Sequence, residues 1–241
     1  MYKRIKILDQ PLNSLQPLWR YLSHDKLVRL LLDRQLWFSH LPRLTDGLEG
    51  TLTQRTHERL VHHFLGQGHS LESAREQVDN YEQHRADFFV NCWHMNRAES
   101  YLMWRVYSDR GFAVQTTFER LQLALDASDD EVNGTVVEYR DFSREALPVG
   151  NIFTAVKTKD APYQEEREFR LLVWRPDPLG RRNQPQPSGI SVAVNLPALV
   201  ERLYVSPSFS GDLTAIRGAL AEAGVSCELR ASSVVERVTT G

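Results

Sequence analysis

The chain contains little cysteine: two residues, Cys92 and Cys227, among 241. Two thiols are too few for a disulfide framework or for a zinc site built from thiolates. Both lie in apolar surroundings, in the segments VNCWHM and GVSCEL, which is typical of buried thiols in a reducing compartment. We therefore expect two buried thiols and no disulfide-linked partner.

Long hydrophobic runs and a strong excess of charge are also missing. No segment approaches the roughly 20 apolar residues of a membrane-spanning helix, and no apolar core of a signal peptide follows the basic start MYKRIKILDQ. The formal net charge of -2 argues against a basic nucleic-acid-binding arm and a polybasic membrane anchor. These absences predict a soluble, cytoplasmic protein that does not contact a membrane.

The signatures of three common enzyme classes are absent. No glycine-rich segment ends in Gly-Lys-Ser/Thr, no Gly-x-Gly-x-x-Gly follows a predicted strand, and no Gly-x-Ser-x-Gly is present. The sequence therefore argues against P-loop nucleotide hydrolysis, a Rossmann dehydrogenase and an ordinary α/β hydrolase.

The histidines do not form a metal-binding motif. None belongs to a His-Glu-x-x-His pattern, and the adjacent His62 and His63 point to different faces of a helix. Solvated histidines are the simpler interpretation, and we predict no histidine-based metal site.

The segments that are present predict an α+β fold, with a central mixed or antiparallel sheet of about six or more strands and flanking helices. The length and the ordinary composition, 41% hydrophobic and 25% charged, suit a single domain over residues 1–241. Strands are expected at residues 18–23, 36–41, 88–95, 111–118, 135–142, 168–175, 190–196, 202–207 and 225–232, and helices at 24–35, 99–109, 119–128, 151–160, 197–201 and 210–224.

Residues 51–86 are polar, have helical periodicity and break at Gly66–Gly68, which predicts a helical hairpin inserted between strand-containing parts. Two starts are open for its second helix: Ser70 as the N-cap with Glu72 in the first turn, or Ser73 with Glu76 as a capping box. The Pro/Gly-rich residues 176–189 predict an exposed loop.

Several polar residues interrupt otherwise apolar strands or directly flank them. A charge in a buried strand is costly unless it is paired or used. One interpretation is an internal ion-pair network, in which Arg20 or Arg170 neutralises Glu166 or Glu168; the other is a functional site. Strand alternation would place Glu166, Glu168 and Arg170 on one face and Arg167 and Phe169 on the other. The polar residues concerned are Arg20, Ser39, Asp46, Glu49, Glu166 and Glu168.

The segments LWRYLS, LWFSHLPRLTDGLEG, NCWHMNRAESYLMWRVYSDRGFAVQTTF, VVEYRDF and VKTKDAPYQEEREFRLLVW resemble the bacterial domain of unknown function 2971 family over roughly residues 18–175. Gly47 departs from the pattern, which usually has proline after the aspartate. That family implies no firm activity. The matching residues are Tyr21, Ser23, Phe38, Ser39, Asp46, Glu49, Gly50, Met103, Trp104, Tyr107, Gly111, Tyr139, Lys157 or Lys159, Glu166, Glu168 and Arg170.

A looser pattern is similar to ADP-ribosyltransferases of the Arg–Ser–Glu type: an arginine on a first strand, an aromatic-Ser pair on a second and Glu-x-Glu at the start of a late strand. The resemblance implies that Arg20 supports the phosphates or ribose of NAD and that Ser39 shapes the nicotinamide pocket. It also implies that Glu168 holds the ribose hydroxyl and stabilises the oxocarbenium-like transition state. Glu166 would orient or activate the acceptor. A fixed carboxylate suits this reaction because positive charge develops at the ribose carbon.

Aromatic side chains near these positions are candidates for stacking on nicotinamide or adenine. Trp37, Phe38, Trp104 and Tyr107 are available for this role, although Trp104 and Tyr107 lie at helical spacing, which is also typical of a core. The residues expected to contact NAD are Arg20, Tyr21, Ser39, Trp104 and Tyr107, with Glu166 and Glu168 catalytic.

Three functions follow as hypotheses. The first is an NAD-dependent ADP-ribosyltransferase or NAD glycohydrolase, a toxin or defence effector of the bacterial cytoplasm that acts on an unknown acceptor macromolecule or small molecule. The second is a non-catalytic binding module with a structural Glu/Arg cluster. The third is a metal-dependent nucleic-acid-processing enzyme that binds magnesium through Asp46, Glu49, Glu166 and Glu168.

Overall fold

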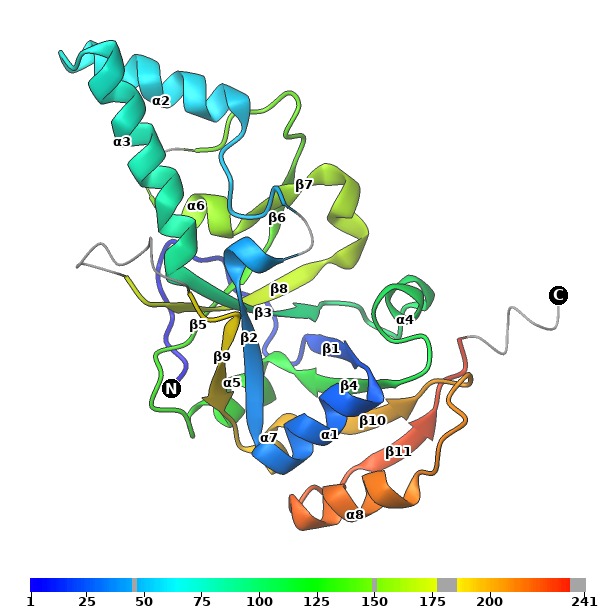
Figure 1. Cartoon of the computed structure of the whole chain (residues 1–241). Coiled ribbons are helices and arrows are strands. Elements are labelled where there is room, and N and C mark those ends of the chain that lie inside the picture. Colours follow the sequence, from blue (N-terminus) through cyan, green and yellow to red (C-terminus); the bar gives the residue numbers. More distant parts are fainter. Residues whose placement is uncertain (45–46, 149–150, 177–185, 235–241) are drawn as a thin grey trace, which may run out of the picture.

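The computed structural model describes residues 1–44, 47–148, 151–176 and 186–234. It has the predicted α+β class, with a mixed sheet of nine strands in the described residues and helices packed around it (Figure 1). No helix in these ranges is long and apolar enough to cross a membrane. The expected loop at 176–189 falls mostly on residues 177–185, outside the described residues.

The main sheet has the order β11-β10-β4-β1-β3-β2-β9; β8 pairs with β3, and β5 with β8. The β10–β11 pair is parallel and the other pairs are antiparallel. Its strands are β1 (Pro17–Leu22), β2 (Gln35–His40), β3 (Phe88–His94), β4 (Phe112–Thr117), β5 (Asn133–Val136), β8 (Glu168–Trp174), β9 (Gly189–Ala193), β10 (Arg202–Val205) and β11 (Glu228–Ala231).

Helices cover both faces of this sheet. The largest hydrophobic cluster joins one face to α1, α5, α7 and α8, while α6 packs on the other face through Phe153 and Val156. The helices are α1 (His24–Asp33), α2 (Gln54–Gly66), α3 (Leu71–Gln83), α4 (Tyr101–Tyr107), α5 (Phe118–Leu125), α6 (Phe153–Val156), α7 (Leu196–Leu199) and α8 (Thr214–Glu222), with short 3-10 turns η1 (Leu41–Arg43), η2 (His84–Asp87) and η3 (Ala161–Glu166).

The predicted helical hairpin is confirmed: α2 and α3 pack against each other and project from the sheet (Figure 1). Of the two possible starts for α3, the structure has the first. The Ser70 hydroxyl accepts a hydrogen bond from the Ser73 N–H at 3.2 Å, which satisfies one of the unpaired donors of the first turn.

Two predicted elements are wrong in part. The strand expected at 135–142 is divided: β5 joins the main sheet, whereas β6 (Glu138–Arg140) pairs in parallel with β7 (Thr158–Asp160) in a separate two-stranded sheet. The helix expected at 151–160 ends at Val156. The Val156 carbonyl accepts a hydrogen bond from Arg170 Nη1 at 2.8 Å, a bond that a continued helix would give to the N–H of Asp160.

Candidate functional site

The sheet forks at β3. One edge of β3 pairs with β8 over its whole length, so β1 and β2 share the other edge. There β2 pairs at Phe89 and Val90, and β1 pairs only at His94. Side chains replace the missing strand partners between these points. Arg20 donates from Nη1 to the Cys92 carbonyl at 2.5 Å, and Asn91 donates from Nδ2 to the carbonyl of Trp37 at 2.9 Å.

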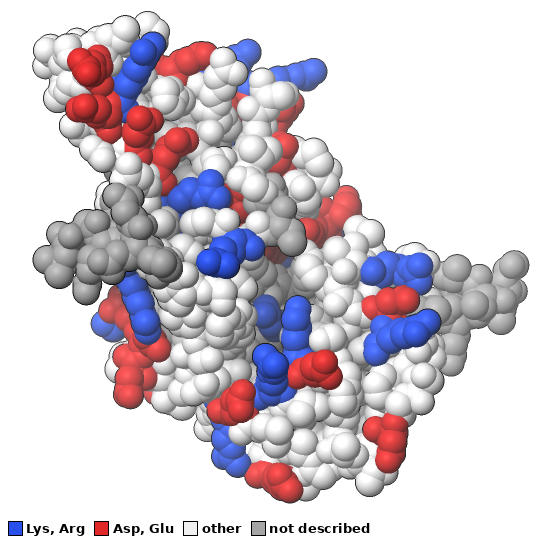
Figure 2. Space-filling view, in the orientation of Figure 1, with Lys and Arg blue, Asp and Glu red and all other residues white. Residues whose placement is uncertain are grey.

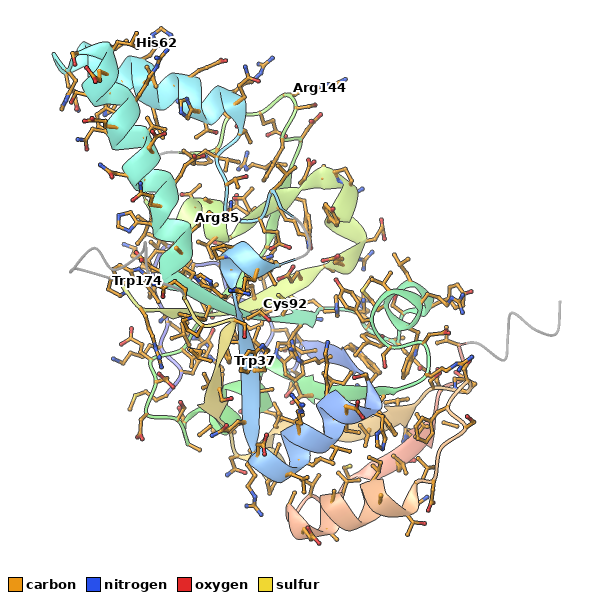
Figure 3. The ribbon with its side chains drawn as sticks, viewed as in Figure 1. Trp37, His62, Arg85, Cys92, Arg144 and Trp174 are labelled. Atoms are coloured by element: carbon orange, nitrogen blue, oxygen red, sulfur yellow. The ribbon has the colours of Figure 1, made fainter. Side chains whose placement is uncertain are left out.

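The surface is hollowed at this fork. Figure 2 shows a hollow near the middle of the molecule, with basic side chains inside it and over α1 beside it; α1 carries the exposed Lys26 and Arg29. In the same view, Figure 3 shows Cys92 in this region with Trp37 next to it. Because Arg20 bonds to the Cys92 carbonyl, its guanidinium belongs to the same place.

Arg20 is a cation without a carboxylate partner among the residues that the structure describes. It is half-buried and forms no ion pair within the described part of the chain. Burial lowers its pKa, and the neighbouring Cys92, Glu168 and Tyr107 act in the opposite direction. A guanidinium stays protonated near neutral pH even so. Most of its five N–H donors therefore remain available to an anionic ligand.

A buried cluster of five charged side chains lies on the β8 side of the fork; we call it the Glu–Lys–Arg cluster. Lys159 Nζ lies 2.9 Å from Glu49 Oε1 and 2.8 Å from Glu166 Oε2. Arg170 binds Glu168 from Nε at 2.7 Å and Glu49 from Nη2 at 2.5 Å. Two cations thus hold three carboxylates in a region where unpaired charge would be costly.

Glu168 is the most enclosed carboxylate of the cluster, with its side chain 1% exposed. Burial alone raises its pKa, but the charge of Arg170, the hydrogen bonds from Arg170 and the charge of Lys159 outweigh burial and lower the pKa to about 2. The partner's pKa moves consistently: burial lowers that of Arg170, while Glu168 and Glu49 raise it further than burial lowers it. Glu168 is therefore ionised and locked against cations.

Glu166 differs from Glu168 in position and access. It lies at the end of η3, not on β8, and its side chain is 13% exposed. Its Oε1 accepts a hydrogen bond from the Tyr107 hydroxyl at 3.1 Å, and its backbone carbonyl lies 2.9 Å from His94 Nδ1. The predicted shared strand face therefore includes Glu168 and Arg170 but not Glu166. Of the two glutamates, Glu166 is the one nearer to solvent.

The aromatic residues expected at the site divide into buried and exposed ones. Tyr21 and Trp104 are buried and meet edge to face at 5.0 Å between ring centres. Trp104 Nε1 donates to Glu99, and the Tyr21 hydroxyl accepts from the Ser100 N–H. Both rings therefore belong to the core and cannot stack on a ligand. The face of α4 that carries Trp104 packs against the sheet.

Tyr107, at the end of α4, is 44% exposed, and burial of its hydroxyl followed by the charge of Glu166 raises its pKa. Trp37 on β2 is 48% exposed, and its indole lies over Gly189 of β9. Ser39 is half-buried, with Val90 opposite on β3 and Gly189 opposite on β9. These three side chains remain open to a ligand.

Two residues of the site carried little signal in the sequence. Cys92 was expected to be a plain buried thiol, yet it is half-buried, and its pKa is raised by burial and by the neighbouring charge of Glu168. Lys159 and Lys157 were equivalent candidates. The structure puts Lys159 in the Glu–Lys–Arg cluster, while Lys157 pairs with Glu138 and Asp9. The two lysines differ only in their place in the fold: Lys157 follows α6, whereas Lys159 lies on β7.

The carboxylates of the magnesium hypothesis do meet, but around cations. Glu49, Glu166 and Glu168 bind Lys159 and Arg170 at the centre that a metal would occupy. Asp46 lies outside the described residues. Within the described ranges no group of three or more histidine, cysteine, aspartate or glutamate side chains is arranged to hold a metal ion.

Comparisons with known proteins leave the chain without an assigned family. No protein-family model, curated protein or solved structure matches it.

Proposed function

We propose that the protein binds NAD in the hollow at the β1–β2 fork and breaks its nicotinamide–ribose bond, as an ADP-ribosyltransferase or an NAD glycohydrolase. The observation that carries this proposal is Arg20, a half-buried guanidinium with no ion pair in the described residues and one hydrogen bond, to the Cys92 carbonyl. Such a group is suited to the phosphates of a dinucleotide, because guanidinium and phosphate form paired, charge-assisted hydrogen bonds.

The surroundings of Arg20 support a nucleotide over a smaller anion. Basic side chains border the hollow over α1, with acidic ones beside them (Figure 2), and the basic ones are available to a second phosphate group. Trp37 on β2 has an exposed indole that lies over Gly189 of β9, and aromatic rings of this kind stack on bases.

The reaction requires a carboxylate near the ribose. Nicotinamide leaves as a neutral molecule with the electron pair of the C1′–N bond, and positive charge develops at C1′. Water or an acceptor group then bonds to C1′ and releases a proton to a base. We assign both tasks to Glu166, because it is the more exposed carboxylate and Tyr107 and Lys159 hold it in place. Glu168 then acts as a positioning residue through Arg170 and Lys159.

A second candidate function is a binding module without catalysis. The observation that favours it is the engagement of Glu168, whose two oxygens both bond to Arg170, at 2.7 and 3.1 Å. On this account the Glu-x-Glu-x-Arg segment stabilises the fold, and the hollow only binds its ligand.

A titration with NAD tests whether the protein binds the dinucleotide. Ligand at about 100 times its Kd stabilises a protein by roughly 2.7 kcal/mol, so we expect NAD to raise the Tm of the wild type by several degrees. Arg20→Gln should lose this shift, and Arg217→Gln, an exposed arginine of α8, should keep it. Absence of any shift at millimolar NAD in the wild type would overturn NAD binding altogether.

Catalysis is then tested by measuring the release of nicotinamide with chromatography. The first proposal expects release by the wild type, with and without added acceptor protein, and its loss in Glu166→Gln while the NAD-induced Tm shift remains. Binding without release favours the second candidate. Glu168→Gln is measured beside Glu166→Gln: if it alone abolishes release with its stability intact, Glu168 is the reacting carboxylate and our assignment to Glu166 is wrong.

A further inference from the structure

A cavity of about 300 Å³ lies beyond the end of β3, next to the start of α4, and the proposed NAD site does not use it. It is formed by the segment between β3 and α4 together with the residues that lead into β8. The polar residues of its lining are Asn96, Arg97, Glu99, Ser100, Glu165 and Arg167.

Buried aromatic side chains fix the wall of this cavity. Trp19 donates from Nε1 to the Asn96 carbonyl at 2.8 Å, and the Ser100 N–H donates to the Tyr21 hydroxyl at 2.8 Å. Both rings are buried in the cluster under α4. The cavity is therefore held open by the core, which lowers the entropy lost when a ligand binds.

Its arginines have no partner on the wall. Glu99 is the nearest candidate by sequence, but Trp104 Nε1 donates to its Oε2 at 3.0 Å and the Ser233 N–H to its Oε1 at 3.2 Å. Arg97 and Arg167 are exposed and form no ion pair within the ranges that the structure describes. Two guanidinium groups thus line one cavity without a bound carboxylate.

One further feature of the wall is a donor without a partner. The Asn96 Nδ2 atom is buried and has no hydrogen-bond partner among the described residues, and a buried donor without an acceptor is unfavourable. The left-handed backbone of Arg167, with φ 44°, has a separate cause, because this residue caps the C-terminal end of η3 as Arg34 caps that of α1.

We infer that this cavity binds the carboxylate of an acidic residue in a peptide ligand. A carboxylate matches the two exposed arginines of the lining, and the exposed Glu165 disfavours a second negative charge, such as that of a phosphate dianion. The ligand extends as a peptide over α4, where Leu102 and Val106 are 47% and 59% exposed. These two side chains are four residues apart and share one helix face.

The test uses the indole N–H signals of Trp19 and Trp104 in NMR spectra, because these groups bond to the cavity wall. The probes are acetyl-Glu-Leu-amide, acetyl-Gln-Leu-amide, acetate and inorganic phosphate. We expect a saturable shift of both signals with the glutamate peptide, and binding at least about tenfold weaker for its glutamine counterpart, which lacks the charge-assisted bonds. Acetate should bind more weakly than the glutamate peptide because it lacks the leucine.

Variants assign the shift to the cavity. Arg97→Gln and Arg167→Gln should each weaken the glutamate peptide by roughly tenfold, Glu165→Gln should strengthen it a few-fold, and Arg217→Gln should change nothing. Saturation that persists in the Arg97→Gln, Arg167→Gln double variant would overturn the site. So would the lack of a saturable shift with the glutamate peptide. Tighter binding of phosphate would overturn the carboxylate class. None of these outcomes depends on NAD, so the inference and the proposed function fail separately.

Discussion

Arg170 binds both carboxylate oxygens of Glu168, Nε to Oε1 at 2.7 Å and Nη2 to Oε2 at 3.1 Å. The two residues lie two positions apart on β8, so their side chains leave the same face of the sheet. Arg170 is fully buried, and it also bonds to Glu49 and to the Val156 carbonyl. One side chain therefore ties β8 to the loop after η1 and to the end of α6, and the first two predictions follow from this position.

Replacing Arg170 by methionine removes one cation from the cluster and leaves Glu168 and Glu49 buried with Lys159 alone. Breaking a buried pair in this way costs about 3–5 kcal/mol, and we expect the free energy of unfolding from urea titrations to fall by that amount. The matched control is Arg105→Met, which breaks an exposed pair with Asp109 and should cost less than about 1 kcal/mol. Similar losses in both variants would contradict a stabilising role for the buried cluster.

Stability should fall in acid through Glu168. Its pKa is lowered from 4.5 to about 2 in the folded protein, so the unfolded chain takes up the proton first as the pH falls. The contribution of Glu168 is therefore complete above about pH 5 and is lost between pH 5 and 2, with a size of about 3 kcal/mol. Unfolding free energies measured from pH 7 to pH 3 should decline more steeply for the wild type than for Glu168→Gln. Parallel curves would show that Glu168 is not held ionised.

Most of the fold could be predicted because its elements have strong local patterns. The strands β1, β3 and β8 are short runs rich in aromatic and branched apolar residues, and the polar periodicity of residues 51–86 indicates a hairpin. The division at residue 137 had no such signal. Glu138–Arg140 has the composition of a continuing strand. It leaves the main sheet because it pairs with β7, and this pairing is a tertiary contact that the local sequence does not indicate.

The site was predictable in its residue types but not in its connections. Arg20, Glu166 and Glu168 stand out because charge is unusual in or beside apolar strands. The contact of Arg20 with the Cys92 carbonyl depends on the fork between β1 and β2. The register of these strands cannot be predicted from either segment alone. The same holds for Trp104 and Tyr107: helical spacing gives their relative direction on α4, and only packing decides which one is buried.

The start of α3 offers a test with two neighbouring serines. The Ser70 hydroxyl caps the helix, so Ser70→Ala should lower the free energy of unfolding by roughly 1 kcal/mol. Ser73→Ala lies inside the first turns, where alanine is the better helix former, and should cost less. Urea denaturation of both variants measures the difference. A larger loss for Ser73→Ala would favour the capping box that begins at Ser73.

The Cys92 thiol should react slowly although solvent reaches it in part. Burial and the charge of Glu168 raise its pKa well above the ordinary value, and the thiolate is the form that reacts with disulfide reagents. In a Cys227→Ala background, Ellman's reagent at pH 8 should label native Cys92 at least about tenfold more slowly than the unfolded chain, since one pKa unit changes the thiolate fraction tenfold.

The Glu168→Gln variant distinguishes two reasons for slow labelling of Cys92: a raised thiol pKa and steric shielding of the thiol. Glu168→Gln removes the negative neighbour and leaves Arg170 and Lys159 in place, so the Cys92 thiolate should become more stable and its labelling faster. Shielding alone predicts no change, because glutamine has nearly the volume of glutamate. The pH dependence of the labelling rate in both proteins measures the pKa directly, and a rate in Glu168→Gln equal to or below that of the parent would contradict the electrostatic coupling of Cys92 to the cluster.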